Sequence, residues 1–293
     1  MKEFIKRLLV TVIGVPLAIW LIYAGGIVFF VLVLILSSVT LWEYYRLCKI
    51  KGLFPFINAG IISHLLFLVI FYLILTGNVN SMKYEIILAI LIFFVLFVLT
   101  LALYQKTESI IFSISSTLSG LIYITMPFSA MLLLRNLHLS SEFLKYFELK
   151  NMVLTDAGSA GLIMTTFLTV WICDTCAYLL GMAFGRHNLM PSVSPKKTWE
   201  GAIGGFLGAV LSFWAASYWL LPGFGVYNAL LLGAIIGVIG QIGDLAESKI
   251  KRDAAVKDSS NIIPGHGGLL DRFDSILFVI PAVLIYLLFY IQF

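Results

Sequence analysis

Long, uninterrupted apolar runs decide what this chain can fold into. A helix that spans a membrane needs about 20 predominantly apolar residues, and the 293-residue sequence contains nine such runs. Hydrophobic residues make up 61% of the chain and charged residues only 12%, about half the charge of a typical soluble domain. The runs also lack the alternation that a membrane β-barrel requires. We therefore predict an all-α, polytopic integral membrane protein.

Short polar loops separate the nine predicted helices. The helices cover residues 8–24, 27–46, 56–76, 84–104, 110–134, 158–184, 201–221, 226–250 and 275–292. Because the loops are too short to fold separately, we predict one membrane domain over residues 1–293. Within it, we expect residues 1–135 to supply lipid-facing helices and oligomer contacts, and residues 158–293 to supply the catalytic helices and loops.

Basic residues indicate how the chain is oriented. Loops on the cytoplasmic side of a membrane are enriched in Lys and Arg. If the N-terminus lies in the cytoplasm, 15 of the 19 Lys and Arg residues fall on the inner side and four on the outer side. This bias predicts a multi-pass protein of the cell (inner) membrane with a cytoplasmic N-terminus. The long outer connection, residues 135–157, mixes both signs of charge and is expected to form a solvated cap.

One carboxylate interrupts the predicted helix 158–184. Asp174, in the stretch VWICDTCAYLLGMAFGR, lies about ten residues from the inner end of that helix. Ionisable groups at membrane depth are costly and are functional candidates, so Asp174 either makes a structural hydrogen bond or lines a polar cavity. Neighbouring Cys173 and Cys176 have no second ligand pair nearby, and we expect them to act as small hydrophobic residues.

A second charged cluster lies in the stretch SVSPKKTWEGAIGGFLG. Ser194 and Pro195 match the N-cap and first residue of a helix, which would place Lys196 and Lys197 in its first turn. Cations at this end oppose the helix dipole, and a bound anion such as phosphate would relieve that conflict. The alternative is that the two lysines contact lipid headgroups.

The third cluster is the most highly charged part of the chain, GQIGDLAESKIKRDAAVKDSSNIIPGHGGLLDRFDS. Asp244, either Glu247 or Ser248, and Lys251 recur at helical spacing and share one face. The loop that follows is rich in glycine, which lets backbone N–H groups approach a phosphate closely. If residues 271–274 are helical, the two Asp residues there also share a face.

Three carboxylates of this cluster are candidate metal ligands. Asp244, Asp271 and Asp274 offer hard oxygen donors of the kind Mg²⁺ prefers, and this ion binds one or two carboxylates together with substrate phosphates and water. Zinc is disfavoured because His266 has no Cys or second His beside it. The alternative is an ion-pair network between these acids and the nearby bases.

The same region carries a family resemblance. The pattern S-x-I-K-R at 248–252, K-D at 257–258 and P-x-H-G-G-L-x-D-R-F-D at 264–274 resembles the signature of phosphatidate cytidylyltransferases. The stretches SPKKTWEGAIGG and WICDTCAYLLGMAFGR resemble the same family in the same order, so the resemblance covers about the last 120 residues. The first half is similar only in hydropathy and in Glu43 of LWEYYR.

The resemblance implies a nucleotidyltransferase of phospholipid biosynthesis. Such an enzyme transfers CMP from CTP to phosphatidic acid and releases CDP-diacylglycerol and pyrophosphate. It requires Mg²⁺, and a second cation such as K⁺ is a further option. The resemblance also implies a homodimer in the lipid bilayer, with no nucleic-acid partner, and an active-site cavity that opens to the cytoplasm and to the lipid.

The predicted residue roles follow the charges. Asp244, Asp271 and Asp274 would hold the cation, and Lys251 and Arg252 would bind phosphates of CTP. Lys196 and Lys197 would attract the phosphatidate headgroup. The full set of further substrate-binding candidates is Ser248, Lys257, Asp258, His266, Gly267, Gly268, Arg272, Ser194, Lys196, Lys197 and Asp174.

Two other functions use similar residues. An ion- or proton-coupled transporter could use Asp174, Asp244 and Asp271 as a relay. However, the outer helix ends carry almost no charge and no inverted repeat is visible in the sequence. A CDP-alcohol phosphotransferase would carry a longer Asp-rich helix pattern, which the sequence lacks.

Overall fold

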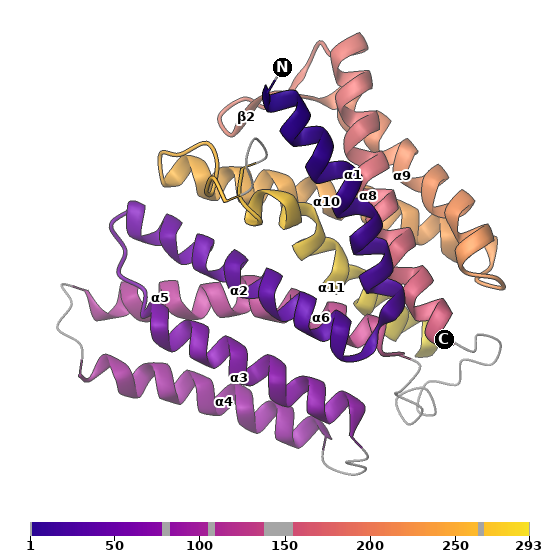
Figure 1. Ribbon diagram of the computed structural model, residues 1–293. Helices are drawn as coiled ribbons and strands as arrows, with labels where there is room; N and C mark the ends of the chain where they lie inside the picture. Colours follow the sequence, from indigo (N-terminus) through magenta and orange to yellow (C-terminus); the bar gives the residue numbers. More distant parts are fainter. Residues whose placement is uncertain (1, 78–82, 105–108, 138–154, 263–266, 293) are drawn as a thin grey trace.

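The structure, a computed structural model, is built almost wholly from helices (Figure 1). It describes residues 2–77, 83–104, 109–137, 155–262 and 267–292. The helices are α1 (Lys2–Ala24), α2 (Gly26–Ile50), α3 (Ile57–Thr76), α4 (Lys83–Ala102), α5 (Ile110–Gly120), the π-helix η1 (Leu121–Thr125), α6 (Met126–Arg135), α8 (Asp156–Phe184), α9 (Trp199–Leu220), α10 (Val226–Asp253) and α11 (Leu270–Gln292). Two short strands, β1 (Asn188–Met190) and β2 (Ser194–Thr198), form an antiparallel hairpin.

The helices confirm the predicted all-α, polytopic fold. Among the described residues, eight helices are long and apolar enough to cross a membrane. The stretch α5–η1–α6 counts as one of them. The first predicted span, 8–24, lies within α1, whose described apolar part is the shorter helix Gly14–Ala24. Most of the predicted outer cap, from residue 138 to 154, lies outside the described residues.

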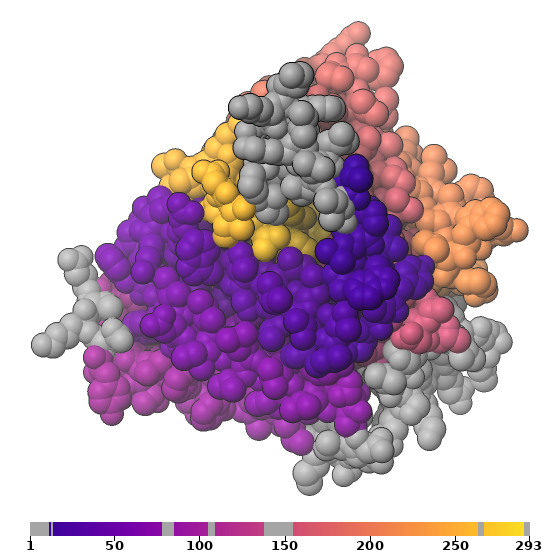
Figure 2. Space-filling view, viewed as in Figure 1, coloured from indigo at the N-terminus to yellow at the C-terminus, as the bar shows by residue number. Residues whose placement is uncertain are grey.

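The outer surface is apolar, as a lipid boundary requires. Large hydrophobic side chains such as Ile111, Leu207 and Trp219 are exposed. Figure 2 shows that the N-terminal helices form much of one face, with the C-terminal segments at its upper and right edges. Side chains that face lipid need not be buried in protein, so this exposure is consistent with a chain that uses the bilayer as its solvent.

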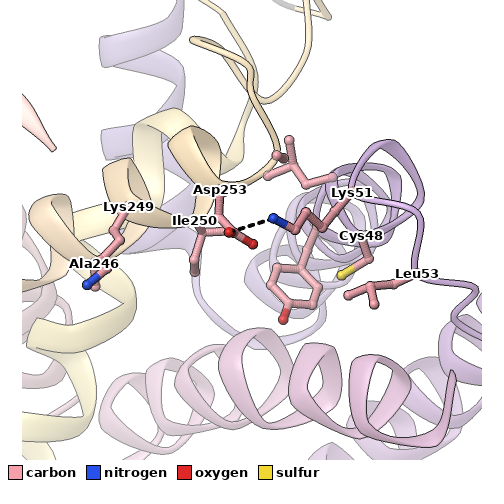
Figure 3. Close-up of a pocket in the computed structure, with 10 residues that line it drawn as sticks. Cys48, Lys51, Leu53, Ala246, Lys249, Ile250 and Asp253 are labelled. Atoms are coloured by element: carbon pink, nitrogen blue, oxygen red, sulfur yellow. Dashed lines mark hydrogen bonds and ion pairs between the residues drawn. The ribbon is translucent and has the colours of Figure 1, made fainter. Parts of the chain in front are cut away.

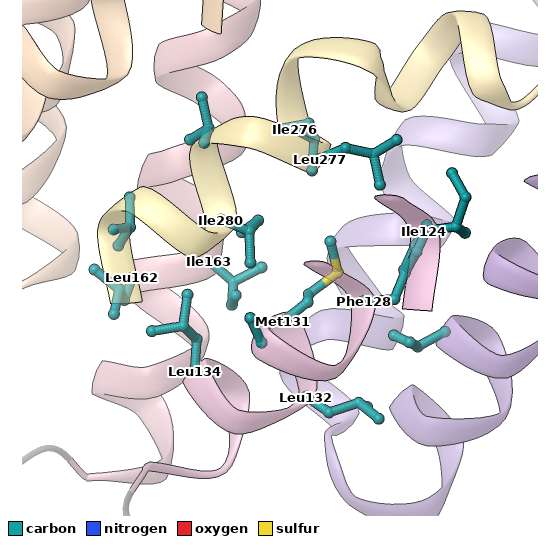
Figure 4. Packing of buried hydrophobic residues seen from close by; sticks show 14 of the residues in the cluster. Ile124, Phe128, Met131, Leu132, Leu134, Leu162, Ile163, Ile276, Leu277 and Ile280 are labelled. Carbon is teal, nitrogen blue, oxygen red and sulfur yellow. The ribbon is translucent and has the colours of Figure 1, made fainter. Parts of the chain in front are cut away.

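Helix α11 joins the two halves of the molecule. It contacts α10 and α8 on one side, and α6 and α2 on the other (Figure 1). Figure 4 shows Ile276 and Ile280 of α11 against Phe128 and Met131 of α6 and Ile163 of α8, all of them buried. Because lipid tails are as apolar as these side chains, close packing rather than the hydrophobic effect holds the helices together here. This contact places the start of α11 beside α10.

Helices α8 and α9 approach each other closely through glycine. Gly205 of α9 lies against the backbone and Sγ of Cys173, and Gly208 lies against Sγ of Cys176. Both cysteines are free thiols. They therefore act as small packing residues, as predicted.

Long-range contacts group the helix ends into two sets. Lys51 at the end of α2 forms an ion pair with Asp253 at the end of α10, with 2.8 Å between Nζ and Oδ1. Arg135 at the end of α6 binds the last turn of α1 and Asp156 at the start of α8. The basic residues predict that the first set lies on the inner side of the membrane and the second set on the outer side.

The predicted start of α9 is wrong. Ser194 lies in β2, which pairs with β1, and the helix begins at Trp199. Thr198 is the N-cap, and its Oγ1 accepts a hydrogen bond from Gly201 N at 3.2 Å. Proline favours an extended conformation in the residue before it, and Thr198 supplies the cap four residues later. Lys196 and Lys197 therefore lie on a strand and not in a first helical turn.

A buried arginine holds the ends of three helices together. Arg135 is fully buried; its Nε donates to Ile22 O at 2.7 Å, and its Nη1 lies 2.5 Å from Asp156 Oδ1. Gly25, with φ of +60°, lies directly against the guanidinium. A side chain at position 25 would clash with Arg135 Nη2.

We expect Gly25→Ala to destabilise the protein by more than about 1 kcal/mol, because it adds a clash with Arg135 to an unfavourable backbone conformation. Gly26→Ala is the matched control: Gly26 has φ of +50°, but a Cβ there meets no atom within 4 Å. Thermal unfolding in detergent measures both. Equal melting temperatures for the two variants would contradict a specific role for the Arg135 contact.

Candidate active site

Lys251 is held between two carboxylates. It lies in the last turn of α10, where its Nζ is 2.7 Å from Oε2 of Glu247, one turn earlier, and 2.6 Å from Oδ1 of Asp271 on α11. Glu247 is fully buried, and the side chain of Lys251 is only 12% exposed. The predicted shared face of α10 is confirmed, and tertiary packing adds Asp271 to it.

Asp271 ties the loop before α11 to Lys251. Its Oδ2 accepts hydrogen bonds from Gly268 N at 2.8 Å, Ser259 N at 3.0 Å and Ser259 Oγ at 2.9 Å, and its Oδ1 accepts from Lys251. Both oxygens are thus engaged by protein donors. The N–H of Gly268 points to this carboxylate, and Gly267, with φ of +80°, makes the turn that places it there.

A second group of charges lies next to this one. Lys197 of β2 forms an ion pair with Asp244 of α10. Asp174 of α8 and Asp274 of α11 both interact electrostatically with Asp244. The side chain of Asp174 is exposed, and the charged groups that act on it are Asp244 and Lys197. Carboxylates from three helices therefore lie close to one another, and one of them, Asp244, pairs with a lysine of the hairpin.

Two further predicted residues support this region. Ser248 Oγ donates to Asp244 Oδ1 at 3.4 Å. Arg252 Nε donates to the carbonyl of Val193, between the two strands, at 3.4 Å, and its Nη1 donates to the carbonyl of Val256 at 3.0 Å. In this geometry Arg252 connects the end of α10 to the hairpin that carries Lys197.

The remaining candidates lie at the surface around these two groups. Lys196, Lys257, Asp258 and Arg272 are exposed. His266 lies outside the described residues, which resume at residue 267.

The arrangement limits how these residues could hold a metal. Among the described residues, no group of three or more His, Cys, Asp or Glu side chains could hold a metal ion. The carboxylate of Asp271 contacts Lys251 and the loop before α11. The carboxylates of Asp244 and Asp274 instead lie close enough to interact electrostatically with each other. Mg²⁺ needs only one or two carboxylates when substrate phosphates and water complete its shell. The hard oxygens of Asp244 and Asp274 fit such a shared site.

One buried acid, Glu43 of α2, enters the sequence analysis only through the family resemblance of its stretch and has no predicted role there. It is fully buried and accepts hydrogen bonds from Leu270 N at 2.7 Å and Leu269 N at 3.1 Å, at the start of α11. The signal that could have found it is the cost of a charge inside an apolar run, because Glu43 is the single acid within residues 27–46.

A separate cavity of about 490 Å³ lies between the ends of α2 and α10 (Figure 3). Ala246, Lys249 and Asp253 line it from α10, and Lys51 closes one side through its ion pair with Asp253. These α10 residues lie on a different helical face from Asp244 and Lys251. The cavity is therefore distinct from the charged cluster.

Comparisons with known proteins show which family this chain belongs to. Residues 5–290 match the family described as the cytidylyltransferase family. A protein of Synechocystis named phosphatidate cytidylyltransferase is 32% identical over 289 residues, which is 95% of this chain and 94% of that protein. Proteins of the same name from Staphylococcus aureus (strain COL) and Staphylococcus haemolyticus are 47% and 44% identical over 126 residues, about half (48%) of each relative's length. This chain therefore belongs to the cytidylyltransferase family.

Proposed function

We propose that this chain is a phosphatidate cytidylyltransferase that makes CDP-diacylglycerol and pyrophosphate from CTP and phosphatidic acid. The observation that carries the proposal is that Asp174 and Asp274 lie near Asp244, which pairs with Lys197, next to the Lys251–Asp271 pair. Carboxylates that could bind Mg²⁺ therefore lie beside lysines that could bind phosphates, near the ends of membrane helices. The names and coverage of the relatives support the same reaction.

We also propose that the chain lies in the cell (inner) membrane with this site facing the cytoplasm. Fifteen of the 19 basic residues fall on that side when the N-terminus is cytoplasmic, and CTP is a water-borne substrate. A homodimer is proposed on the family resemblance alone.

The reaction is a displacement at phosphorus. An oxygen of the phosphatidate phosphate attacks the α-phosphorus of CTP, a new P–O bond forms, and the bond from the α-phosphorus to the bridging oxygen breaks to release pyrophosphate. The second pKa of a phosphate monoester is near 6, so the nucleophile is largely dianionic at neutral pH. A strong base is not needed. The barrier is the repulsion between two anions, which positioning and charge neutralisation reduce.

The described residues divide this work between two groups. Asp244 and Asp274, with Asp174 beside them, would hold Mg²⁺, which when bound neutralises charge on the CTP phosphates. Lys251 would bind a phosphate of CTP or the departing pyrophosphate, and Asp271 would orient it. Lys197 lies next to Asp244 and would bring the lipid phosphate to the nucleotide.

The decisive test is a CTP-dependent lipid assay. Membranes containing the full chain are supplied with labelled CTP, phosphatidic acid and Mg²⁺, and both labelled lipid and pyrophosphate are measured. Equal amounts of the two products are expected. A transporter would form neither, and a CDP-alcohol phosphotransferase would consume CDP-lipid without using CTP. Absence of a CTP-dependent lipid product would refute the proposal.

The hairpin lysines give a more specific expectation. Lys196 is exposed on β2, and one basic residue near an anionic lipid surface contributes about 1 kcal/mol. We expect Lys196→Ala to raise the KM for phosphatidate about fivefold and to leave the KM for CTP unchanged. Lys49→Ala is the control, because Lys49 is exposed at the end of α2 on the same side. An unchanged KM for phosphatidate in Lys196→Ala would count against this role.

A further inference from the structure

We infer that Glu43, on α2, is a positioning residue for the reaction: it holds the 259–260 segment against the start of α11, and through these contacts it sets the positions of Asp271 and Lys251. This inference rests on the proposed function. It assigns to the N-terminal helices a direct part in building the active site.

Glu43 is enclosed by four hydrogen-bond donors. Oε1 accepts from Ser260 Oγ at 2.5 Å and from Leu269 N at 3.1 Å. Oε2 accepts from Leu270 N at 2.7 Å and from Ser259 Oγ at 3.3 Å. Among the described residues no base forms an ion pair with Glu43. A buried carboxylate without a counter-ion is costly unless it is fully hydrogen-bonded, so this loop conformation is the one that satisfies it.

The helix that Glu43 touches is the one that carries Asp271. Leu270 is the first residue of α11, and its N–H is among those that lack a partner within the helix. A carboxylate at this end also interacts favourably with the helix dipole. Glu43 therefore caps α11 from a residue 227 positions earlier in the chain.

Glu43 and Asp271 meet at one serine and one glycine. The hydroxyl of Ser259 lies 2.9 Å from Asp271 Oδ2 and 3.3 Å from Glu43 Oε2, so its single proton is shared between the two carboxylates. A Cβ at Gly268 would clash with Ser259 Oγ and lie 2.6 Å from Glu43 Oε1. The contacts thus run without a gap from Glu43 through Ser259 to Asp271 and Lys251.

This connection explains how a residue outside the site can affect the chemistry. If the carboxylate of Glu43 is lost, the first turn of α11 and the 259–260 segment lose their shared acceptor. Asp271 then loses the fixed positions of Ser259 and Gly268, and Lys251 shifts with it. Small displacements of a positioned group are costly in a reaction that depends on alignment.

Glu43→Gln tests the inference with an almost isosteric change. The amide places an NH₂ group among donors, so at least one hydrogen bond becomes a repulsion. For the purified full chain with Mg²⁺ in phosphatidate–detergent micelles, we expect kcat/KM for CTP to fall about 10- to 100-fold. The KM for CTP should rise and the KM for phosphatidate should stay unchanged. A purely structural role would reduce the amount of folded enzyme and leave both KM values as they are.

Thr40→Val is the matched control. Thr40 is fully buried one turn before Glu43 on α2, and its hydroxyl donates to Leu36 O of its own helix at 2.8 Å. We expect its kinetic constants to remain within about twofold of wild type, because the loop is not its partner. A loss equal to that of Glu43→Gln would indicate a general defect of α2 and overturn the inference.

Amide hydrogen exchange supplies a readout that does not depend on activity. Glu43→Gln should speed exchange at Leu269 and Leu270, and Thr40→Val should not. Unchanged exchange together with an unchanged KM for CTP would overturn the inference. If the wild-type chain makes no CTP-dependent lipid, the proposed function is wrong, and Glu43 then has no role in that reaction. The exchange result then decides whether Glu43 holds the loop.

Discussion

Replacing Asp274 with Asn is expected to lower CTP incorporation into lipid by at least about 100-fold, the scale of losing one charged group that stabilises a transition state. Asp274 accepts a hydrogen bond from its neighbour Ser275 N at 2.6 Å, and its charge faces Asp244. Asn keeps the shape but removes the negative charge that would bind Mg²⁺. Labelled-CTP assays at several Mg²⁺ concentrations, normalised to folded protein, measure the effect.

The Mg²⁺ series separates a lost ligand from a lost fold. Higher Mg²⁺ should restore part of the activity of Asp274→Asn if the carboxylate binds the cation. Asp253→Asn is the matched control: it removes an acid from the end of α10 whose only described ion pair, with Lys51, is exposed, and such pairs contribute about 0–1 kcal/mol. Near-normal activity of Asp274→Asn at limiting Mg²⁺ would remove Asp274 from the metal site.

Lys251→Met is expected to abolish activity and to destabilise the protein by about 3–5 kcal/mol, because it leaves a buried charge without its partner. Glu247 is fully buried, and among the described residues it forms an ion pair with Lys251 alone. Asp271 keeps its hydrogen bonds to Ser259 and Gly268 in this variant. Loss of the lysine therefore costs Asp271 less than it costs Glu247. Unfolding by titration with SDS in mixed micelles gives the free energy of unfolding.

A double variant separates the two effects of Lys251. In Lys251→Met with Glu247→Gln, the buried charge is gone, so most of the lost stability should return. Activity should not return, because the ammonium that would bind phosphate is still missing. Recovery of activity in the double variant would show that Lys251 only neutralises Glu247. A stable Lys251→Met single variant would contradict the buried ion pair itself.

The helices were predictable because each follows from its own residues. In a bilayer an apolar run of sufficient length must form a helix, since only then are its backbone groups hydrogen-bonded. The start of α9 was not predictable in this way. Ser194 and Thr198 are both good N-caps, and pairing of β2 with β1 selects the second. As a result, Lys197 lies on β2 beside Asp244 and not in the helical turn that was predicted.

The shared helical face of Asp244 and Lys251 was predictable, but the partners of the charged residues were not. Helical spacing placed Asp244 and Lys251 on one face of α10, as observed. It could not show that Asp271 would turn to Lys251 while Asp274 faced Asp244. Both acids share one face of α11, so the packing of α11 against α10 decides which base or acid each one meets.

The sequence by itself determined the membrane-spanning helices and the charged residues that lie at their ends, because transfer of apolar segments into lipid depends on local composition. Only the tertiary structure decided how those charges pair. Charge pairing depends on distances of a few ångströms between elements far apart in the chain, such as Glu43 and Leu270, which are 227 residues apart. No local pattern encodes such a distance, because it is set by how whole helices pack.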